Sequence, residues 1–320
     1  MNKVWWSLLL LLCSHLALAS SSETAIGWKV ADHLPYLEER LKQGQLDALE
    51  ALLVTLPDPD AEQLRWLLLQ SLSPLERPQE SVRSWVNAQA QRVAQDFDEI
   101  TRDGFLVSLP RHDYPALARN LLQSWQQLDW QAQYSVQLQQ GNFVLRSLYR
   151  LNNPDVMRQQ SALLAALPGA PLPVLQGLAR ELARSALFLP DNQLAYALLS
   201  HTGEPELFRA LWSRPVDSAS LQAVSLVTRF HQGSTAGDLL LAAARIPALN
   251  SRAMLTLGGL QPLPVKARDY LQRELGIGPQ GVSLSRLLKP REESLQLILL
   301  ADRLLHDQMG PAKRPELGRP

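Results

Sequence analysis

Apolar residues recur at intervals of three and four along most of the chain, the spacing that places them on one face of an α-helix. In the N-terminal part this pattern predicts a helical region over 20–96, with breaks at Gly44 and Pro57. Asp60 and Gln63 resemble a capping box, which predicts that a helix begins at Asp60.

The region 97–151 has a different pattern. Asp103-Gly104 is a strong signal for a two-residue hairpin turn. Such a turn places Ile100 opposite Val107 on two paired strands. An apolar stripe with helical spacing follows this hairpin.

A second hairpin is predicted after that helix. Apolar and polar residues alternate from Tyr134 to Leu138, and Gly141-Asn142 can turn the chain back. The interpretation is a small α+β module of hairpin, helix and hairpin (ββαββ) over 97–151. The alternative is two more helices with unusual patterning.

From 152 to 308 the chain has the pattern of short amphipathic helices separated by Pro and Gly. Helix pairs recur at a spacing of roughly 25–30 residues, which is typical of stacked helical repeats. The tail 309–320 is polar and rich in Pro and Gly, and we expect it to be disordered. The predicted helices cover 155–167, 172–187, 191–200, 205–213, 217–231, 235–245, 249–260, 264–275, 281–288 and 291–308. The predicted fold is mainly α, a helical-repeat (α-solenoid-like) array with a small α+β insertion.

Part of this array resembles a HEAT-type repeat. The segments 248–260 and 263–271 look like second helices of such repeats, and Val265-Lys266 matches the Val-Arg pair of the family pattern. The Asp that precedes this pair in the family is missing from both segments. The similarity covers about 203–290, and it implies a curved scaffold that binds other macromolecules and carries no catalytic residues.

The first 19 residues have the pattern of a secretory signal peptide. Lys3 supplies a positive charge, an apolar stretch follows, and Ala17 and Ala19 form a small-x-small cleavage site before Ser20. We therefore expect export, and a mature protein located in the periplasm or secreted.

Two alternatives exist for this segment: an uncleaved anchor, or a lipoprotein modified at Cys13. The apolar stretch is shorter than the roughly 20 residues that a membrane span needs. Leu12 stands where a lipobox requires a small residue. Cys13 is the only cysteine, so cleavage after residue 19 leaves a chain without disulfides. No later stretch is apolar enough for a membrane span in the mature chain.

Composition supports a folded, mostly helical protein. The chain is 46% hydrophobic and 19% charged, which excludes a wholly disordered chain. Leu far outnumbers Ile, and Leu is the better helix former. The 31 basic residues balance the 31 acidic ones, so we expect no nucleic-acid partner.

Sequence motifs for catalysis and for cofactors are missing. The chain contains no H-E-x-x-H, G-x-S-x-G or S-x-x-K motif and no glycine-rich phosphate loop. We therefore expect no catalytic residue, cofactor or metal site. Two groups resemble cation sites loosely, and we interpret them as a solvated helix surface and as charge that protects a strand edge. These groups are His33 with Glu38 and Glu39, and Asp96 with Asp98 and Glu99.

Five residues are candidates for partner binding. Trp130 is out of phase with the apolar stripe that precedes it, so it can lie exposed. Arg180 and Arg184 share one predicted helix, and Arg209 and Arg214 lie at another. In a helical-repeat array, equivalent helices line one surface, which would carry these arginines.

The predicted function is a protein-binding scaffold, adaptor or assembly factor of the bacterial envelope, and the predicted partner is another envelope or secreted protein. The alternative is an enzyme or small-ligand-binding protein with its site in the 97–151 module. Such a cleft would hold His112, Asp113, Tyr134 and Arg146. A dedicated folding factor for a secreted enzyme is a further idea, without a motif to support it.

Overall fold

The structure is a computed structural model, and the described part of the chain is mainly helical. It divides into two compact units, and the division falls between Asp129 and Trp130. The predicted signal peptide with its predicted cleavage site Ala17-Leu18-Ala19-Ser20, and the tail after Met309, lie outside the described residues. The structure describes residues 27–150, 152–185, 187, 189–278, 281–282 and 294–309.

The first unit begins with four helices, and their breaks follow the glycine and proline signals. Gly44, between α2 and α3, has a φ of 73°, which a glycine adopts without steric cost. Pro57 directly precedes α4. The predicted start at Asp60 is wrong, because α4 already begins at Asp58 and no side chain caps it. The four helices are α2 (Gly27–Lys42), α3 (Leu46–Thr55), α4 (Asp58–Gln70) and α5 (Glu80–Ala90).

These helices pack around one apolar core together with the first half of α6 (Tyr114–Gln140). Leucines at helical spacing fill this core. Trp125 of α6 also belongs to it, and only 1% of the surface of this residue is exposed. The indole Nε1 of Trp125 donates to the Ser73 carbonyl oxygen over 3.0 Å, which satisfies the polar atom of a buried aromatic side chain.

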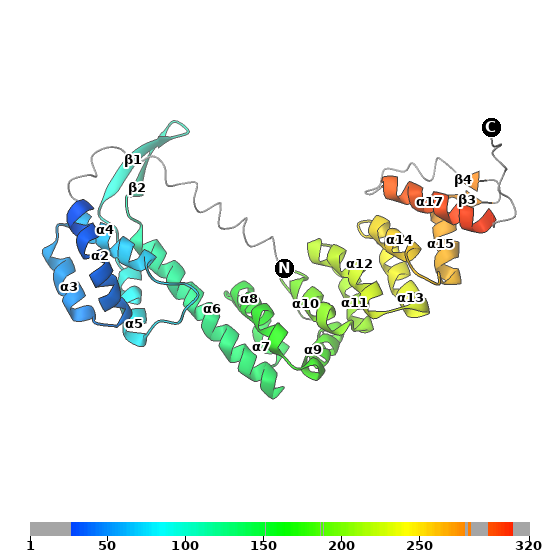
Figure 1. Ribbon diagram of the computed structural model, residues 1–320, viewed down its shortest axis with the longest axis horizontal. Helices are drawn as coiled ribbons and strands as arrows, with labels where there is room; N and C mark the ends of the chain where they lie inside the picture. The colour runs from blue at the N-terminus through cyan, green and yellow to red at the C-terminus, as the bar shows by residue number, and fades with distance from the viewer. Residues whose placement is uncertain are drawn as a thin grey trace, which may run out of the picture. The chain divides into compact units, whose positions relative to one another are not determined.

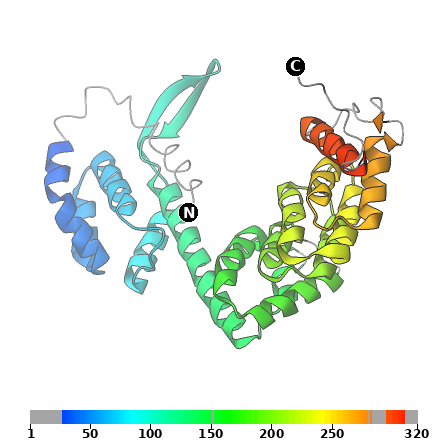
Figure 2. The same ribbon diagram turned by 45° about the vertical axis from the view of Figure 1, so that its right-hand side comes forward.

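A two-stranded antiparallel sheet connects α5 to α6. It consists of β1 (Phe97–Arg102) and β2 (Phe105–Pro110). Ile100 pairs with Val107, so the predicted register of the first hairpin is confirmed. In Figures 1 and 2 the two strands project as a ribbon beyond the helices of this unit.

The second predicted hairpin is wrong, and with it the ββαββ arrangement of 97–151. Helix α6 continues through Tyr134 and Leu138, and the short helix α7 (Leu145–Leu148) follows. Tyr134 and Leu138 are four residues apart and both are buried, so they share a helix face rather than a strand face. The predicted turn at Gly141-Asn142 is real, but it ends a helix.

The second unit is a succession of short helices, and most of the predicted helices are confirmed. The predicted helix 281–288 is wrong at its start, because Gly281–Val282 forms strand β4, paired with β3 (Ile277–Gly278). Residues 283–290 lie outside the described ones. The helices are α8 (Val156–Ala166), η1 (Leu167–Gly169), α9 (Leu172–Arg184), α10 (Gln193–Thr202), α11 (Pro205–Trp212), α12 (Ser218–Phe230), α13 (Gly233–Ala244), α14 (Asn250–Gly258), α15 (Val265–Leu275) and α17 (Ser294–Met309).

Each helix of the second unit packs against helices that are near it in the sequence. Helix α9 contacts α10 and α11, α10 contacts α12, α11 contacts α13, and α12 contacts α14. Helix α17 covers the end of this succession by packing against α14 and α15. The helices accordingly follow one another along the unit in chain order (Figures 1 and 2). One continuous apolar core runs from α6 to α17.

Hydrogen bonds between buried and half-buried polar groups join α10 to α12. The Asp217 carboxylate accepts the backbone N–H of Ser220 over 2.9 Å and the N–H of Asn192 over 3.0 Å. The Asn192 side chain donates in turn to the Pro215 carbonyl and to the Ser220 hydroxyl. Asp217 therefore caps α12 and also fixes the start of α10.

Candidate functional site

The β1–β2 hairpin is the candidate functional site, and its turn is well defined. Asp103 and Gly104 have φ angles of 52° and 81°, as a two-residue type I′ turn requires at both central positions. Asp tolerates this left-handed conformation better than most residues, and glycine adopts it freely. Arg102 and Phe105 pair directly across the turn.

The hairpin exposes apolar side chains on both faces. Phe105 and Leu106, next to the turn, are 74% and 68% exposed. Since side chains alternate between the two faces of a strand, Ile100, Phe105 and Leu109 share one face. Phe97 and Leu106 lie on the other face. Contiguous exposed apolar surface of this kind marks an interaction site in soluble proteins.

A buried carboxylate holds the base of the hairpin on the helices. Glu62 of α4 is 3% exposed, and its two oxygens accept the backbone N–H groups of Gln95 and Asp96 over 2.6 and 3.2 Å. Hydrogen bonds from backbone N–H groups to a charged acceptor are stronger than neutral ones. The first strand therefore leaves the helical core from a fixed point.

Arg111 binds the two strands to each other at the same end. Its guanidinium donates to Asp98 Oδ1 over 2.8 Å and lies 3.5 Å from Asp96 Oδ2. The hydrogen bond from Arg111 lowers the pKa of Asp98 below its ordinary value. Two of the three predicted acidic residues, Asp96 and Asp98, are thus partners of an arginine in the structure, while Glu99 is exposed on β1.

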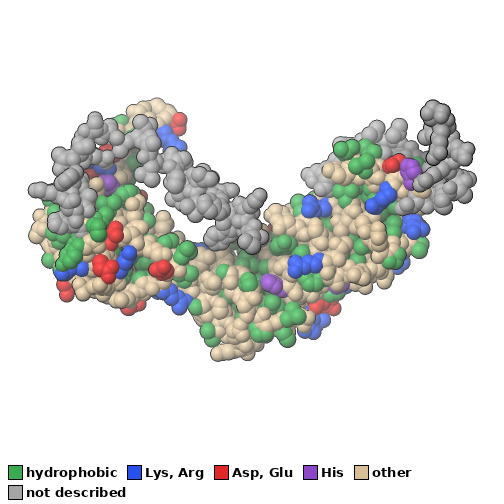
Figure 3. Space-filling model, viewed as in Figure 1, with side chains coloured by type: hydrophobic (Ala, Val, Ile, Leu, Met, Phe, Trp, Pro, Cys, Tyr) green, Lys and Arg blue, Asp and Glu red, His purple; other side chains and the backbone are tan. Residues whose placement is uncertain are grey.

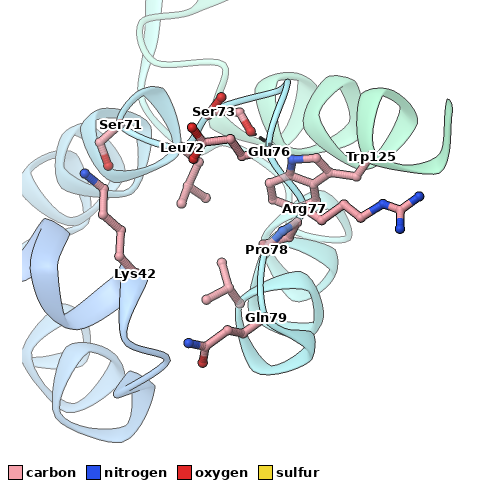
Figure 4. Close-up of a pocket in the computed structure, with 10 residues that line it drawn as sticks. Lys42, Ser71, Leu72, Ser73, Glu76, Arg77, Pro78, Gln79 and Trp125 are labelled. Atoms are coloured by element: carbon pink, nitrogen blue, oxygen red, sulfur yellow. Dashed lines mark hydrogen bonds between the residues drawn. The ribbon is translucent and has the colours of Figure 1, made fainter. Parts of the chain in front are cut away.

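An open pocket of about 520 Å³ lies elsewhere in the first unit. Figure 4 shows Lys42 on one side and Arg77 with Trp125 on the other. The Arg77 guanidinium is engaged, since it donates to the Leu128 carbonyl over 2.7 Å and lies 3.3 Å from an oxygen of Asp129. Trp125 donates to Ser73, as described above. Lys42 and other polar side chains also line the pocket, and such groups can orient a ligand.

Four of the five predicted binding residues lie at the surface or at its edge. Trp130 is half-buried and packs against the core of the second unit. Arg180 and Arg184 are exposed on α9, and Arg184 forms an ion pair of 3.0 Å with Glu206 of α11. Arg209 is exposed on α11. On the face that Figure 3 shows, the basic side chains of the second unit are spread out rather than gathered in one patch.

Arg214, the fifth residue, lies in a structural position. Its Nε donates to the side-chain oxygen of Asn192 over 2.7 Å, and Nη2 donates to the Leu189 carbonyl over 3.3 Å. Arg214 is half-buried and belongs to the polar network around Asn192. Its guanidinium therefore supports the fold, and little of it faces solvent.

The residues of the alternative cleft have separate structural surroundings. The Asp113 carboxylate caps the start of α6 by accepting the N–H of Ala116, and the His112 ring lies 5.4 Å from the Trp66 ring. Tyr134 is buried in the core of the second unit, where burial raises its pKa. Arg146 is exposed on α7. His112 and Asp113 thus belong to the first unit, whereas Tyr134 and Arg146 belong to the second.

No group of three or more metal-ligating side chains comes together among the residues that the structure describes. Glu38 is half-buried and Glu39 is exposed on α2, where Glu39 accepts a hydrogen bond from Gln43. The His33 side chain is outside the described part. Within that part, no helix is long and apolar enough to cross a membrane.

Sequence reasoning located the hairpin but did not predict that its apolar side chains are exposed. The pattern of Phe105 to Leu109 predicts a strand, and a strand in a small module is expected to be covered on one face. The exposure of Phe105 and Leu106 depends on which elements lie over them, and this is not encoded in the local pattern. The uncharged run of five residues directly after the turn fits a covered strand and an exposed strand equally well.

Comparison of the chain with known protein families, with curated proteins and with solved structures found no match. Its own residues and geometry therefore carry the functional inference. Among the surface features of the described residues, the hairpin combines a defined backbone, a fixed base and exposed apolar side chains.

Proposed function

We propose that this protein works by binding another protein, as a scaffold, adaptor or assembly factor, and that the β1–β2 hairpin makes the contact. One observation carries the proposal: Phe97, Ile100, Phe105, Leu106 and Leu109 are all exposed on a hairpin whose base is fixed. Burying these side chains against a partner removes apolar surface from water, which is the main favourable term in protein association.

The character of the surface favours a protein partner over a nucleic acid. Aromatic and aliphatic side chains beside the turn are typical of the centre of a protein interface. The net charge of zero provides no general attraction to phosphate groups. Arg102 and Asp103 at the tip are of opposite sign and add no basic patch.

We propose further that the second unit is a helical-repeat array of the HEAT-like kind. The contacts of each helix with its next neighbours, from α9 to α15, support this architecture. Such an array would present the exposed Arg180 and Arg209 to a partner as a secondary contact. We also propose export to the periplasm or beyond, on the strength of the signal-peptide pattern in residues 1–19.

Affinity capture from envelope extracts, followed by mass spectrometry, tests the proposed function. We expect the protein to retain a specific partner, and the double variant Phe105→Ser/Leu106→Ser to lose it. Val265→Ser is the matched control, because Val265 is an apolar residue of equal exposure (72%) on α15 of the other unit. Retention of the same partner by the double variant, or equal loss in the control, would contradict the proposal.

The alternative function, an enzyme or a small-ligand-binding protein, has one observation in its favour. The pocket of about 520 Å³ falls within the size range of ligand sites, roughly 300–1,000 Å³. Trp125, which belongs to the 97–151 region, lines this pocket, and Lys42 lines it as well. A ligand that raises the melting temperature of the protein, but not that of Lys42→Ala, would support this alternative.

A further inference from the structure

The outer edge of β2 is an unusual feature of the hairpin. Its five residues from Phe105 to Leu109 carry no charge, and within the described part of the chain β2 has a single strand partner, β1. An unpaired strand edge presents backbone N–H and C=O groups that another strand can bind. Natural proteins usually protect such an edge with charge, and here Pro110 alone limits it, by ending the strand.

The register determines which backbone groups point outward from β2. The N–H of Arg111 donates to the Asp96 carbonyl over 2.9 Å, so these opposite residues form a hydrogen-bonded pair. Hydrogen-bonded and non-hydrogen-bonded pairs alternate along an antiparallel ladder. Phe97–Pro110, Glu99–Ser108 and Thr101–Leu106 are therefore the non-hydrogen-bonded pairs, and their backbone groups face away from the partner strand. On β2, Leu106 and Ser108 thus offer both an N–H and a C=O outward, whereas Pro110 has no N–H to offer.

This edge is complementary to itself. In an antiparallel pairing centred on Val107, Leu106 of each copy forms hydrogen bonds with Ser108 of the other, and Phe105 lies opposite Leu109 of the other. The two Val107 side chains meet at the twofold axis on the apolar face. No like charges face each other, and Asp103 and Arg111 of the two copies oppose each other beyond the strand ends.

The outer edge of β1 suits such pairing less well. Its outward-facing residues are Phe97, Glu99 and Thr101. A symmetric pairing centred on Glu99 or on Asp98 sets two carboxylates opposite each other, which is unfavourable. A pairing centred on Ile100 sets Asp98 opposite an arginine, but Asp98 already binds Arg111.

We propose that the β2 edge pairs with the β2 edge of a second copy of this chain, and so forms a four-stranded antiparallel sheet across a twofold axis. The contact is isologous, because the same residues meet from both sides. The inference deepens the proposed function and rests on the hairpin as a contact site. The continuous sheet doubles the apolar face of Ile100, Phe105 and Leu109 that is available to the partner protein.

A disulfide across the twofold axis tests the register directly. In a Cys13→Ser background, which removes the only native cysteine, Val107→Cys places two thiols in a non-hydrogen-bonded pair. The Cα separation of such a pair is about 4.5 Å, within the range that a disulfide spans. Ile100→Cys on the same face is the control, because two copies of residue 100 would be about 14 Å apart, three strand spacings.

We expect mild oxidation to convert the Val107→Cys protein to a covalent dimer on non-reducing gels, and the Ile100→Cys protein to stay monomeric. Equal cross-linking of both variants, or of neither, would overturn the proposal. Absence of a Val107→Cys dimer would mean that this edge is left to a strand of another protein or stays uncovered.

Sedimentation of the chain with its native hairpin residues provides the second test. We expect a monomer–dimer equilibrium in the micromolar range, and Ser108→Pro to abolish it by removing an outward N–H. Glu99→Pro makes the same change on the other edge and should leave the dimer intact; circular dichroism checks that both variants fold. A monomer at every concentration, or equal effects of both prolines, would contradict the pairing. If the monomeric Ser108→Pro variant still captures the partner protein, the proposed function holds without the dimer.

Discussion

Gly104 is the residue on which the shape of the candidate site most depends. It has a φ of 81°, and a Cβ atom built on it would meet no other atom within 4 Å. Any cost of a larger residue here therefore comes from the backbone conformation and not from a clash. The neighbouring Asp103, at a φ of 52°, already bears part of this cost.

We expect Gly104→Val to destabilise the hairpin by about 1 kcal/mol or more, because a β-branched residue disfavours a positive φ. This corresponds to amide hydrogen exchange that is about five-fold faster over residues 98–109, measured by mass spectrometry. Gly169→Val is the matched control: that position is equally open and its φ is not positive. Unchanged exchange in the hairpin would mean that the turn does not need a left-handed residue.

At the scale of elements, proline and glycine made most helix boundaries predictable. Pro171, Pro205 and Pro264 lie at or just before the starts of α9, α11 and α15, as expected from the fixed φ of proline. Gly203 and Gly276 end α10 and α15 in the left-handed conformation. These residues act locally, and for this reason their effect can be predicted from the sequence alone.

Helix α6 shows where prediction failed and why. Alternation from Tyr134 to Leu138 fits a strand, but Trp130, Tyr134 and Leu138 are also spaced four apart and continue a helix. Five residues are too few to separate the two periods. Val136 distinguishes the two periods in the structure. It is exposed while Tyr134 and Leu138 are buried, whereas on a strand all three would share one face. The exposure of the hairpin was likewise not predictable, since it depends on tertiary contacts.

The cap of α12 gives the second unit a dependence on pH. Burial acts to raise the pKa of Asp217, but hydrogen bonds from Ser220 and Asn192 together lower it below its ordinary value of 3.8. A carboxyl group whose pKa is lower in the folded than in the unfolded state stabilises the fold above the unfolded pKa. This stabilisation is lost as the pH falls through the folded pKa.

We therefore expect the free energy of unfolding of the second unit to fall as the pH drops below about 4, and Asp217→Asn to make this fall shallower. Asparagine caps helices about as well as aspartate, so the variant should retain α12. Urea unfolding followed by circular dichroism between pH 6 and pH 2.5 measures the effect, with exposed Asp238→Asn as the control. Parallel pH profiles for the native chain and Asp217→Asn would mean that Asp217 is not the source of the pH dependence.

At the scale of the whole molecule, α17 completes the core of the second unit. Leu297, Leu300 and Leu304 are buried on this helix, which packs against α14 and α15. Without α17, the apolar surface of α14 and α15 would face water. The helix therefore has the position of a terminal cap in the proposed helical-repeat array.

Truncation after Lys289 should lower the melting temperature of the second unit by roughly 10 °C or more, since three buried leucines contribute about 2 kcal/mol each and 1 kcal/mol corresponds to about 2–4 °C. Aggregation or a broad transition is the accompanying expectation. Truncation after Met309, which keeps all of α17, is the control and should leave melting unchanged. If the two truncated proteins melt alike, α17 is not a cap.

The central claim is that the hairpin contacts a protein partner, and site-specific photo-crosslinking in living cells tests it most directly. A photoreactive phenylalanine analogue replaces Phe105 at the hairpin, or Val265 on α15 as an equally exposed control. We predict that residue 105 yields a discrete cross-linked species that contains a second, different protein, and that residue 265 does not. Cross-links from residue 105 that are absent, or that match those of residue 265, would contradict the claim.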